Sequence, residues 1–580
     1  MIPEPPETPE RTYSFLIADC GTSTTTVVLI ETVGNSYRII AKASVPTTAV
    51  PPWNDISQGV QEAILQITEI TGRTFLNDHG GLIRPTQADY SGVDRFALVS
   101  SAAKPLRTLL IGLFEEVSMV SARKALRSIY YQEIDNFSLS DTRTEQEQIV
   151  SLLQASPDLY VITGGTDGGA ENRLLQLTEL ASLGIKVQSN VQRPQLIYAG
   201  NINLREPVRQ LVGESAAIHV ANNVRPSLDT EQLDDVIRLT GELYEDLKIK
   251  GLNGIHELID WSSYPMLPTA RAFAGLIQYF AALHQQQVLG VDLGSNSLTF
   301  TWSDGKDVQL SIHTDLGLGQ PVKNLLELTN PEQIARWVPS DITAADAADY
   351  VLNKSLYPNT IPMVERELHL EQAVARELIR IGLARAASDW QWAPDEMSPF
   401  KMLIVRGSLF ANSPRAGQIM LLLLDALQPT GIFSIALDQY GILPALGSLA
   451  LEEPSAVVQV LETEVLANVG WVIAPTGKGQ IGKTALQFKI EMDGKPLTES
   501  ANYGDLANIP IAPGKEAKIT IEPAGNFDVG AGPGKSTTIT VFGGTVGGFV
   551  VDVRGRPLTL PDDEADRRSL ARKWLWDLGG

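Results

Sequence analysis

The chain is poor in cysteine, in histidine and in positive charge. Its single cysteine, Cys20, excludes an internal disulfide and a metal site built from several cysteines. Its six histidines include no pair at the helical spacing of metal ligands, which argues against a zinc site. Its 46 Lys and Arg against 68 Asp and Glu give a formal net charge of −22. We therefore predict that neither nucleic acid nor an anionic membrane is a partner, because both require clustered cations.

The chain also lacks a long hydrophobic run. Its most apolar segment, residues 419–427, is much shorter than the ~20 residues that span a bilayer. Residues 1–11 are acidic and proline-rich, so we predict a disordered tail there rather than a secretory signal or a transit peptide. Together these absences predict a soluble, cytoplasmic protein.

A pattern of β-rich runs followed by helices opens the chain and returns near residue 288. Residues 14–31 and 36–46 predict hairpin strands, 55–72 a helix, 95–103 a strand and 105–117 a second helix. Between 158 and 223, short strands alternate with helices, which predicts parallel βαβ units. After about residue 455, alternating β-rich runs lie between Gly- and Pro-rich turns. We predict an α/β fold with lobes at 12–287 and 288–455, followed by an all-β domain at 456–580 that ends in a short helix.

The first hairpin carries a turn suited to phosphate. Asp19 ends an apolar strand, and the turn that follows consists of glycine and small hydroxyl residues: Gly21, Thr22, Ser23 and Thr24. Backbone N–H groups and hydroxyls in such a turn can donate hydrogen bonds to a phosphate. A carboxylate at the strand end can hold a hydrated Mg²⁺ that bridges the phosphates.

The second hairpin repeats this arrangement, with Asp292 at the strand end and Gly294, Ser295 and Asn296 in the turn. A single Asp-x-Gly pattern is typical of an ordinary tight hairpin. Two copies, each opening a β-β-β-α run, favour two similar halves that face each other across a cleft. A nucleotide would bind there, with its phosphates between the two turns.

These turns, with a later strand–Gly–Ser–helix element at Gly407 and Ser408, resemble the actin/Hsp70/sugar-kinase ATPase superfamily. The chain resembles the glutamate mutase L family more closely, through segments in the family's order that cover roughly residues 13–450. These segments are IADCGTSTT, LVSSAAKPLR, VITGGTDGGAEN, LIYAGN, MLPTARA, VLGVDLGSNS and LIVRGSLFANSP.

The resemblance implies a two-lobed actin/Hsp70-like ATPase fold that binds ATP with Mg²⁺. It implies that Asp19 and Asp292 are the catalytic, metal-holding carboxylates. It also implies a chaperone or reactivating partner of a cobalamin-dependent mutase, not a mutase, since no Asp-x-His-x-x-Gly cobalamin motif occurs here.

Three residues depart from the family's pattern. Ser295 replaces a glycine and restricts backbone freedom at the second turn. Phe300 takes the place of a carboxylate that could help to place metal or water. Arg406 stands in the adenosine-facing turn, where we expect it to stack on adenine or occupy its site. These changes favour an alternative, a non-catalytic scaffold on the same fold; a small-molecule kinase is a third reading, without an identifiable acceptor site.

Two glycine-rich loops remain. Gly164, Gly165, Thr166 and Asp167 lie between a predicted strand and a predicted helix, in a segment that matches the family. They either bind an anion at the helix N-terminus, with Asp167 near the phosphates, or only form a sharp turn. Residues 477–484 satisfy the P-loop pattern G-x-x-x-x-G-K-[ST], but the following residues alternate like a strand. We therefore predict a β-turn there.

Overall fold

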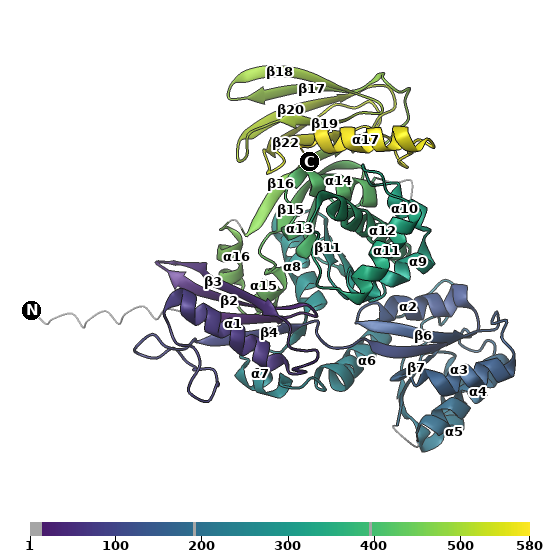
Figure 1. The fold of residues 1–580 in the computed structure, drawn as a ribbon. Coiled ribbons are helices and arrows are strands. Elements are labelled where there is room, and N and C mark those ends of the chain that lie inside the picture. The colour runs from purple at the N-terminus through teal and green to yellow at the C-terminus, as the bar shows by residue number, and fades with distance from the viewer. Residues whose placement is uncertain (1–13, 190–192, 394–396, 464, 580) are drawn as a thin grey trace, which may run out of the picture. The chain divides into compact units, whose positions relative to one another are not determined.

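The computed structural model describes residues 14–189, 193–393, 397–463 and 465–579. The predicted tail at 1–11 lies outside the described residues. The chain divides into two compact units (Figure 1). Unit 1 contains residues 1–102, 253–309 and 316–580, and unit 2 contains residues 103–252 and 310–315.

The first sheet of unit 1 has the strand order β10-β4-β1-β2-β3. Its strands are β1 (Ser14–Cys20), β2 (Thr24–Val33), β3 (Ser36–Pro46), β4 (Arg95–Ser100) and β10 (Leu267–Pro268). β1 pairs antiparallel with β2 and parallel with β4. Helix α1 (Ile56–Thr71) begins where the Asp55 side chain accepts a hydrogen bond from the Ser57 N–H, and ends at left-handed Gly72. The hairpins, α1 and β4 confirm the elements predicted between residues 14 and 103.

The second sheet of unit 1 repeats this plan and then extends it. Its strands β12, β11, β14, β15, β16, β22 and β19 lie side by side in that order. β11 pairs antiparallel with β12 and parallel with β14, just as β1 pairs with β2 and β4. The strands are β11 (Val288–Leu293), β12 (Leu298–Ser303), β14 (Met402–Arg406), β15 (Gly431–Asp438), β16 (Leu466–Ala474), β19 (Leu506–Pro510) and β22 (Gly548–Asp552).

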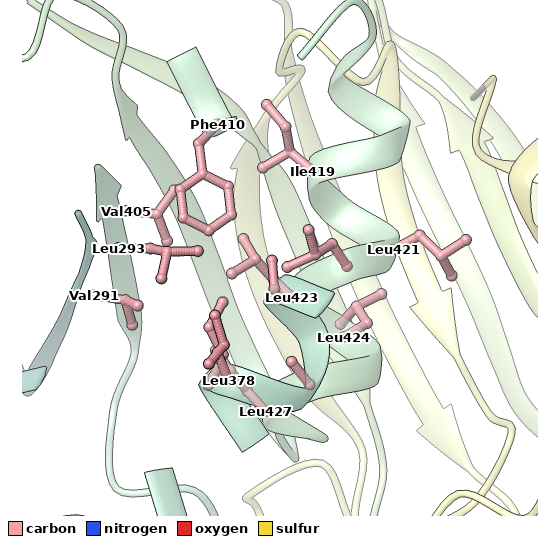
Figure 2. Packing of buried hydrophobic residues seen from close by; sticks show 14 of the residues in the cluster. Val291, Leu293, Leu378, Val405, Phe410, Ile419, Leu421, Leu423, Leu424 and Leu427 are labelled. Carbon is pink, nitrogen blue, oxygen red and sulfur yellow. The ribbon is translucent and has the colours of Figure 1, made fainter. Parts of the chain in front are cut away.

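One face of the second sheet packs on a large apolar core. Figure 2 shows Val291 and Leu293 of β11 and Val405 of β14 in this core, near Phe410 and residues of helix α14. α14 (Ala416–Leu427) is buried all round and packs against α12 (Glu365–Asp389). The other helices of this region are α9 (Leu325–Leu328), α10 (Pro331–Ala335), α11 (Ala344–Leu356) and α13 (Ser408–Ala411).

Helices α8 (Thr269–His284) and α15 (Leu443–Leu449) join the two sheets of unit 1. They share a core with residues of β1, β4, β11, β14 and β15. The helices approach very closely, because a Cβ added to Gly447 would lie 2.0 Å from the Ala272 carbonyl oxygen. α7 (Ile255–Trp261) and α16 (Pro454–Leu461) complete this region.

The C-terminal part adds a four-stranded sheet in the order β18-β17-β20-β21, and every pair in it is antiparallel. Its strands are β17 (Thr484–Met492), β18 (Lys495–Asn502), β20 (Glu516–Pro523) and β21 (Thr537–Phe542). Helix α17 (Glu564–Asp577) follows and contacts β19 and α14, as Figure 1 shows in yellow. This arrangement agrees with the predicted β-rich region and its terminal helix.

Unit 2 is built on a parallel sheet in the order β6-β5-β7-β8-β9. The prediction of a helix at 105–117 is wrong, since β5 (Leu106–Ile111) is a strand at the interior of this sheet. Strands covered on both faces form continuous apolar runs, which periodicity does not separate from a buried helix. The other strands are β6 (Tyr131–Phe137), β7 (Leu159–Ile162), β8 (Gln195–Tyr198) and β9 (Ala217–Val220).

The helices of unit 2 confirm the predicted βαβ alternation. They are α2 (Val120–Leu126), α3 (Glu145–Ala155), α4 (Asn172–Gln188), α5 (Arg205–Val212) and α6 (Asp234–Tyr244). Strand β13 (Val308–His313) contributes residues 310–313 to this unit. In neither unit do the described residues include a helix with the length and hydropathy needed to cross a membrane.

Candidate functional site

The two Asp-x-Gly turns have the same backbone geometry. The Gly21 N–H donates to the Thr24 carbonyl at 2.9 Å, and the Gly294 N–H donates to the Ser297 carbonyl at 2.9 Å. A Cβ at Gly21 would lie 2.8 Å from the Thr24 oxygen, and one at Gly294 would lie 3.2 Å from the Ser297 oxygen. Gly21 therefore needs to be glycine because the chain approaches itself closely in the turn, and at Gly294 a side chain would make a tight contact.

The first turn keeps its side-chain donors available. The Thr47 N–H donates to the Ser23 carbonyl at 2.9 Å, and the Thr47 hydroxyl donates to the Gly21 carbonyl at 3.0 Å. Among the described residues, no partner binds the hydroxyls of Thr22, Ser23 or Thr24. The turn is thus fixed through its carbonyls while its hydroxyls remain free to donate.

The second turn is covered on one side by the segment that follows β13. The Leu318 N–H donates to the Gly294 carbonyl at 3.0 Å, and the Gly319 N–H donates to the Ser295 carbonyl at 2.6 Å. Ser295 and Asn296 are not among the non-glycine residues with positive φ. The second turn therefore does not need glycine at position 295 for a positive φ, and the expected loss of backbone freedom at Ser295 stays a prediction.

Phe300 does not face the paired turns. It pairs with Val291 across the hairpin, whereas Thr299 pairs with Asp292. Because side chains alternate across a strand, Phe300 shares the face of Val291 and lies fully buried in the core described above. The expectation that Phe300 removes a carboxylate from the site is thus wrong: position 300 belongs to the core face.

Arg406 contacts the aspartates that precede both turns. It ends β14, in register with Asp292 of β11. Its Nη1 lies 2.7 Å from Asp292 Oδ2, and its Nη2 lies 3.5 Å from Asp19 Oδ2. The expectation that Arg406 stacks on adenine or occupies its site is corrected, because its guanidinium binds the strand-end carboxylates instead.

A third carboxylate completes the group, which we call the carboxylate cluster: Asp19, Asp292 and Asp438. Asp438 ends β15, and its Oδ2 lies 3.7 Å from Arg406 Nε. It is fully buried, and its two oxygens accept the N–H groups of Ile442 and Leu443 at the start of α15, each at 3.0 Å. Asp438 is not among the predicted site residues, although it ends an apolar strand as Asp19 and Asp292 do.

Thr269, at the start of α8, was also missed as a site residue. Its hydroxyl donates to Asp19 Oδ1 at 3.1 Å. Asp19 therefore accepts from one helix terminus and faces Arg406 with its other oxygen. The only signal for Thr269 in the sequence is its place in MLPTARA, one of the segments that resemble the family.

Burial and charge oppose each other in the cluster. Burial raises the pKa of Asp19 to about 6, although Arg406 and the hydrogen bond from Thr269 act in the opposite direction. Burial likewise raises the pKa of Asp292, against the pull of Arg406. Burial works to lower the pKa of Arg406, but the surrounding carboxylates outweigh it and raise that pKa. The guanidinium is therefore a permanent positive charge at this junction.

The predicted Mg²⁺ ligands do not fit a metal ion in this arrangement. Asp19 and Asp292 both turn an oxygen toward the Arg406 guanidinium, so each carboxylate already faces a positive charge. Within the described ranges, no group of three or more His, Cys, Asp or Glu side chains is placed to hold a metal ion.

Gly407 and Ser408 lie beside the second turn. Gly407 has a φ of 129°, and a Cβ there would lie 2.3 Å from the Leu293 carbonyl oxygen. Ser408 is exposed and begins the short helix α13. Glycine is thus required at 407 both by its backbone conformation and by close approach to β11.

The loop at Gly164, Gly165, Thr166 and Asp167 belongs to unit 2, between β7 and α4. Asp167 Oδ1 accepts the Ile202 N–H at 3.1 Å and the Asn223 amide at 2.9 Å. Gly164 and Gly165 have φ values of 128° and 69°, which favour glycine. The carboxylate of Asp167 therefore orders its own loop, and its predicted role near phosphate stays a prediction.

The P-loop-like segment at 477–484 forms a loop that leads directly into strand β17. A strand follows it instead of a helix, so it lacks the helix N-terminus that helps a P-loop to bind phosphate. The prediction of a β-turn in place of a P-loop is confirmed.

Comparisons with known proteins give the family. One similar solved structure is the nucleotide-free acetone carboxylase, with 11% sequence identity and a TM-score of 0.34. The match covers 84% of this chain and 81% of that chain. It matches gluconate kinase from Lactobacillus acidophilus at 13% identity, with 77% of this chain and 92% of that chain covered and a TM-score of 0.30. It matches component A of the (R)-2-hydroxyglutaryl-CoA dehydratase of Acidaminococcus fermentans at 9% identity, with 77% and 99% covered and a TM-score of 0.28.

These similarities to solved structures are too low to support an argument about function. No curated protein matches the chain. The family model described as "MutL protein" matches residues 15–465, which is most of the chain. This match confirms the resemblance to that family drawn from the motifs. The chain belongs to the MutL protein family.

Proposed function

We propose that this protein binds ATP between its two Asp-x-Gly turns and acts in the cytoplasm as a chaperone-like or reactivating partner of a cobalamin-dependent mutase. The observation that carries the proposal is the convergence of both turns on Arg406. Two equivalent hairpins, one from each sheet of unit 1, end in carboxylates that face a single guanidinium. The family match supports the chaperone-like role.

The proposed contacts follow from the turns. The N–H groups and hydroxyls at Gly21–Thr24 would bind phosphate oxygens, together with Gly294, Ser295 and Asn296 of the second turn. Gly407 and Ser408, beside the second turn, would lie on the adenosine side. Phosphate oxygens are strong acceptors, and the free hydroxyls of the first turn match them.

We infer that hydrolysis, if it accompanies binding, is slow. A general base must be within hydrogen-bond reach of the attacking water and able to accept its proton. Asp19 and Asp292 are the carboxylates next to the turns, and both are paired with Arg406. This pairing also favours the second candidate function, a non-catalytic scaffold that binds a protein partner.

Calorimetry with ATP, alongside a phosphate-release assay, tests the proposal. The double variant Thr22→Val/Ser23→Ala removes two free hydroxyls from the first turn, and we expect it to bind ATP about tenfold more weakly than the wild type. Thr498→Val, at an exposed position of β18, is the matched control and should bind like the wild type. If the wild type neither binds nor hydrolyses ATP, the nucleotide proposal fails and the scaffold remains.

A further inference from the structure

A small cavity lies among helices α12, α14 and α17 of unit 1, and we call it the α17 cavity. Its volume is about 10 Å³, which is room for one group about the size of a water molecule. Three arginines and one aspartate line it, so its lining carries an excess of positive charge in a chain whose net charge is −22. The charged and polar lining residues are Arg336, His369, Gln372, Arg376, Asp425 and Arg567.

The ion pairs around the α17 cavity do not cancel this excess. Asp425 has two arginine partners, with Arg376 Nε 3.0 Å from its Oδ2 and Arg554 Nη1 2.8 Å from its Oδ1. Arg336 Nη2 lies 3.7 Å from Glu377, which has a second arginine partner at 2.6 Å. Each of these two buried carboxylates is therefore shared between two arginines, and positive charge remains.

Arg567, on α17, has no carboxylate partner at all within the described part of the chain. Its Nη1 donates to two backbone carbonyls just before α17, at 2.7 and 3.0 Å. Burial lowers the pKa of Arg336, and the charges of Arg380 and Arg567 act in the same direction, although Glu377 opposes them. The arginines at the cavity thus repel one another, and a negative charge among them would be attracted.

Three buried N–H donors on lining side chains have no hydrogen-bond partner: Arg336 Nε, Arg567 Nε and Gln372 Nε2. Gln372 is only 1% exposed, so bulk water does not satisfy its amide. A buried donor without an acceptor costs free energy. One water molecule has two lone pairs and accepts from two donors, whereas a halide ion can accept from all three. A small anion therefore meets both requirements of the cavity, its unpaired donors and its positive charge.

We propose that the α17 cavity binds a chloride ion. Chloride is compact enough for the cavity, whereas phosphate and sulfate are much larger than a water molecule. Gln372 lies on α12 and Arg567 lies on α17, so an ion that accepts from both joins the C-terminal helix to the second sheet's helices. This site is separate from the Asp-x-Gly turns and does not depend on ATP binding.

The line width of the chloride NMR signal tests the proposal, because a bound halide gives a much broader signal than a free one. The full-length wild type should broaden the signal, and added bromide should reverse the effect by competition. Arg567→Met removes the cation that has no carboxylate partner and keeps its apolar stem. We expect it to bind chloride about tenfold more weakly. Arg572→Ala, an exposed arginine of the same helix, is the control and should broaden the signal like the wild type.

Two results of the NMR measurement would overturn the proposal. If the wild type does not broaden the signal, water alone occupies the cavity. If the wild type and Arg567→Met broaden it equally, chloride binds elsewhere. Anomalous diffraction from wild-type crystals grown in bromide needs no variant, so it decides the question even if Arg567→Met does not fold. We expect a bromide peak among Arg336, Gln372 and Arg567, and a cavity without anomalous signal would also overturn the proposal.

Discussion

At the scale of single residues, the candidate site is a balance between burial and charge. Asp19 is only 6% exposed, and Asp438 is fully buried. Arg406 is the cation that faces both of them, and it also pairs with Asp292. Carboxylates outnumber the cation, so burial is not fully compensated. The raised pKa of Asp19 is the measurable consequence.

The first prediction concerns the pH dependence of thermal stability. The folded pKa of Asp19 is about 6, above the 3.8 of an unperturbed aspartate, so the folded chain holds this proton more tightly than the unfolded chain. The raised pKa of Asp19 therefore adds to the free energy of unfolding in full below about pH 4, and this contribution is lost as the pH rises through about 6. The Tm of Asp19→Asn minus that of the wild type should therefore be larger at pH 7.5 than at pH 4.5. A difference that does not change with pH would contradict this assignment.

The second prediction concerns a buried ion-pair network near the C-terminus. Arg554 Nη1 lies 2.8 Å from Asp425, and its Nη2 lies 2.8 Å from Asp552, with all three side chains at most 2% exposed. Arg554→Met leaves two buried carboxylates with one partner fewer each. We expect it to lower the free energy of unfolding by about 3–5 kcal/mol, measured by urea titration.

Arg568→Met is the matched control for this network. Arg568 pairs with Asp341 and Glu564, both of which are exposed, so its loss should cost less than about 1 kcal/mol. Equal costs for the two variants would show that burial does not set the strength of these pairs.

At the scale of elements, the site depends on two helices as well as on its strands. α8 and α15 start beside the carboxylate cluster, through Thr269 on Asp19 and through the N–H groups that Asp438 accepts. The helices lie close because Gly447 of α15 faces the backbone of Ala272 in α8. This contact joins the two helices whose first residues bind Asp19 and Asp438.

The third prediction tests the helix contact. Gly447→Ala places a Cβ 2.0 Å from a carbonyl oxygen unless the helices separate, and we expect it to cost about 1–3 kcal/mol of stability. Gly275→Ala, in α8, is the control, because a Cβ there meets nothing within 4 Å. That change should stabilise by about 0.5–1 kcal/mol through helix propensity. Calorimetric scans of both variants check the result, and a stabilised Gly447→Ala would contradict the packing described here.

Most elements could be predicted because their signals are local. The hairpins on either side of Asp19 and Asp292 follow from apolar runs and short polar turns, and α1 follows from Asp55 and a helical apolar stripe. β5 could not be separated from a helix, because its burial on both faces comes from tertiary neighbours. Likewise, the direction of Phe300 depends on strand register, which the hairpin pairing reveals.

At the scale of the whole molecule, the two sheets of unit 1 share the same strand pairing around an Asp-x-Gly hairpin. The repeated turns could be predicted from the sequence, but the contacts of Arg406 could not. Its contacts join residues from β1, β11 and β15, and only the folded sheets bring these strand ends together. The two carboxylates could thus be predicted as neighbours from the repeated turns, whereas the arginine between them is seen only in the folded sheets. The Mg²⁺ expected at these carboxylates stays a prediction.

The central claim is that ATP binds at the two Asp-x-Gly turns, and hydrogen exchange followed by mass spectrometry tests it most directly. Peptides that cover residues 19–26 and 292–299 should both exchange more slowly when ATP is added at saturation. A peptide from β20 (Glu516–Pro523) should exchange at the same rate with and without ATP. Unchanged exchange in both turns, with ATP present at a concentration that calorimetry shows to be saturating, would contradict the account.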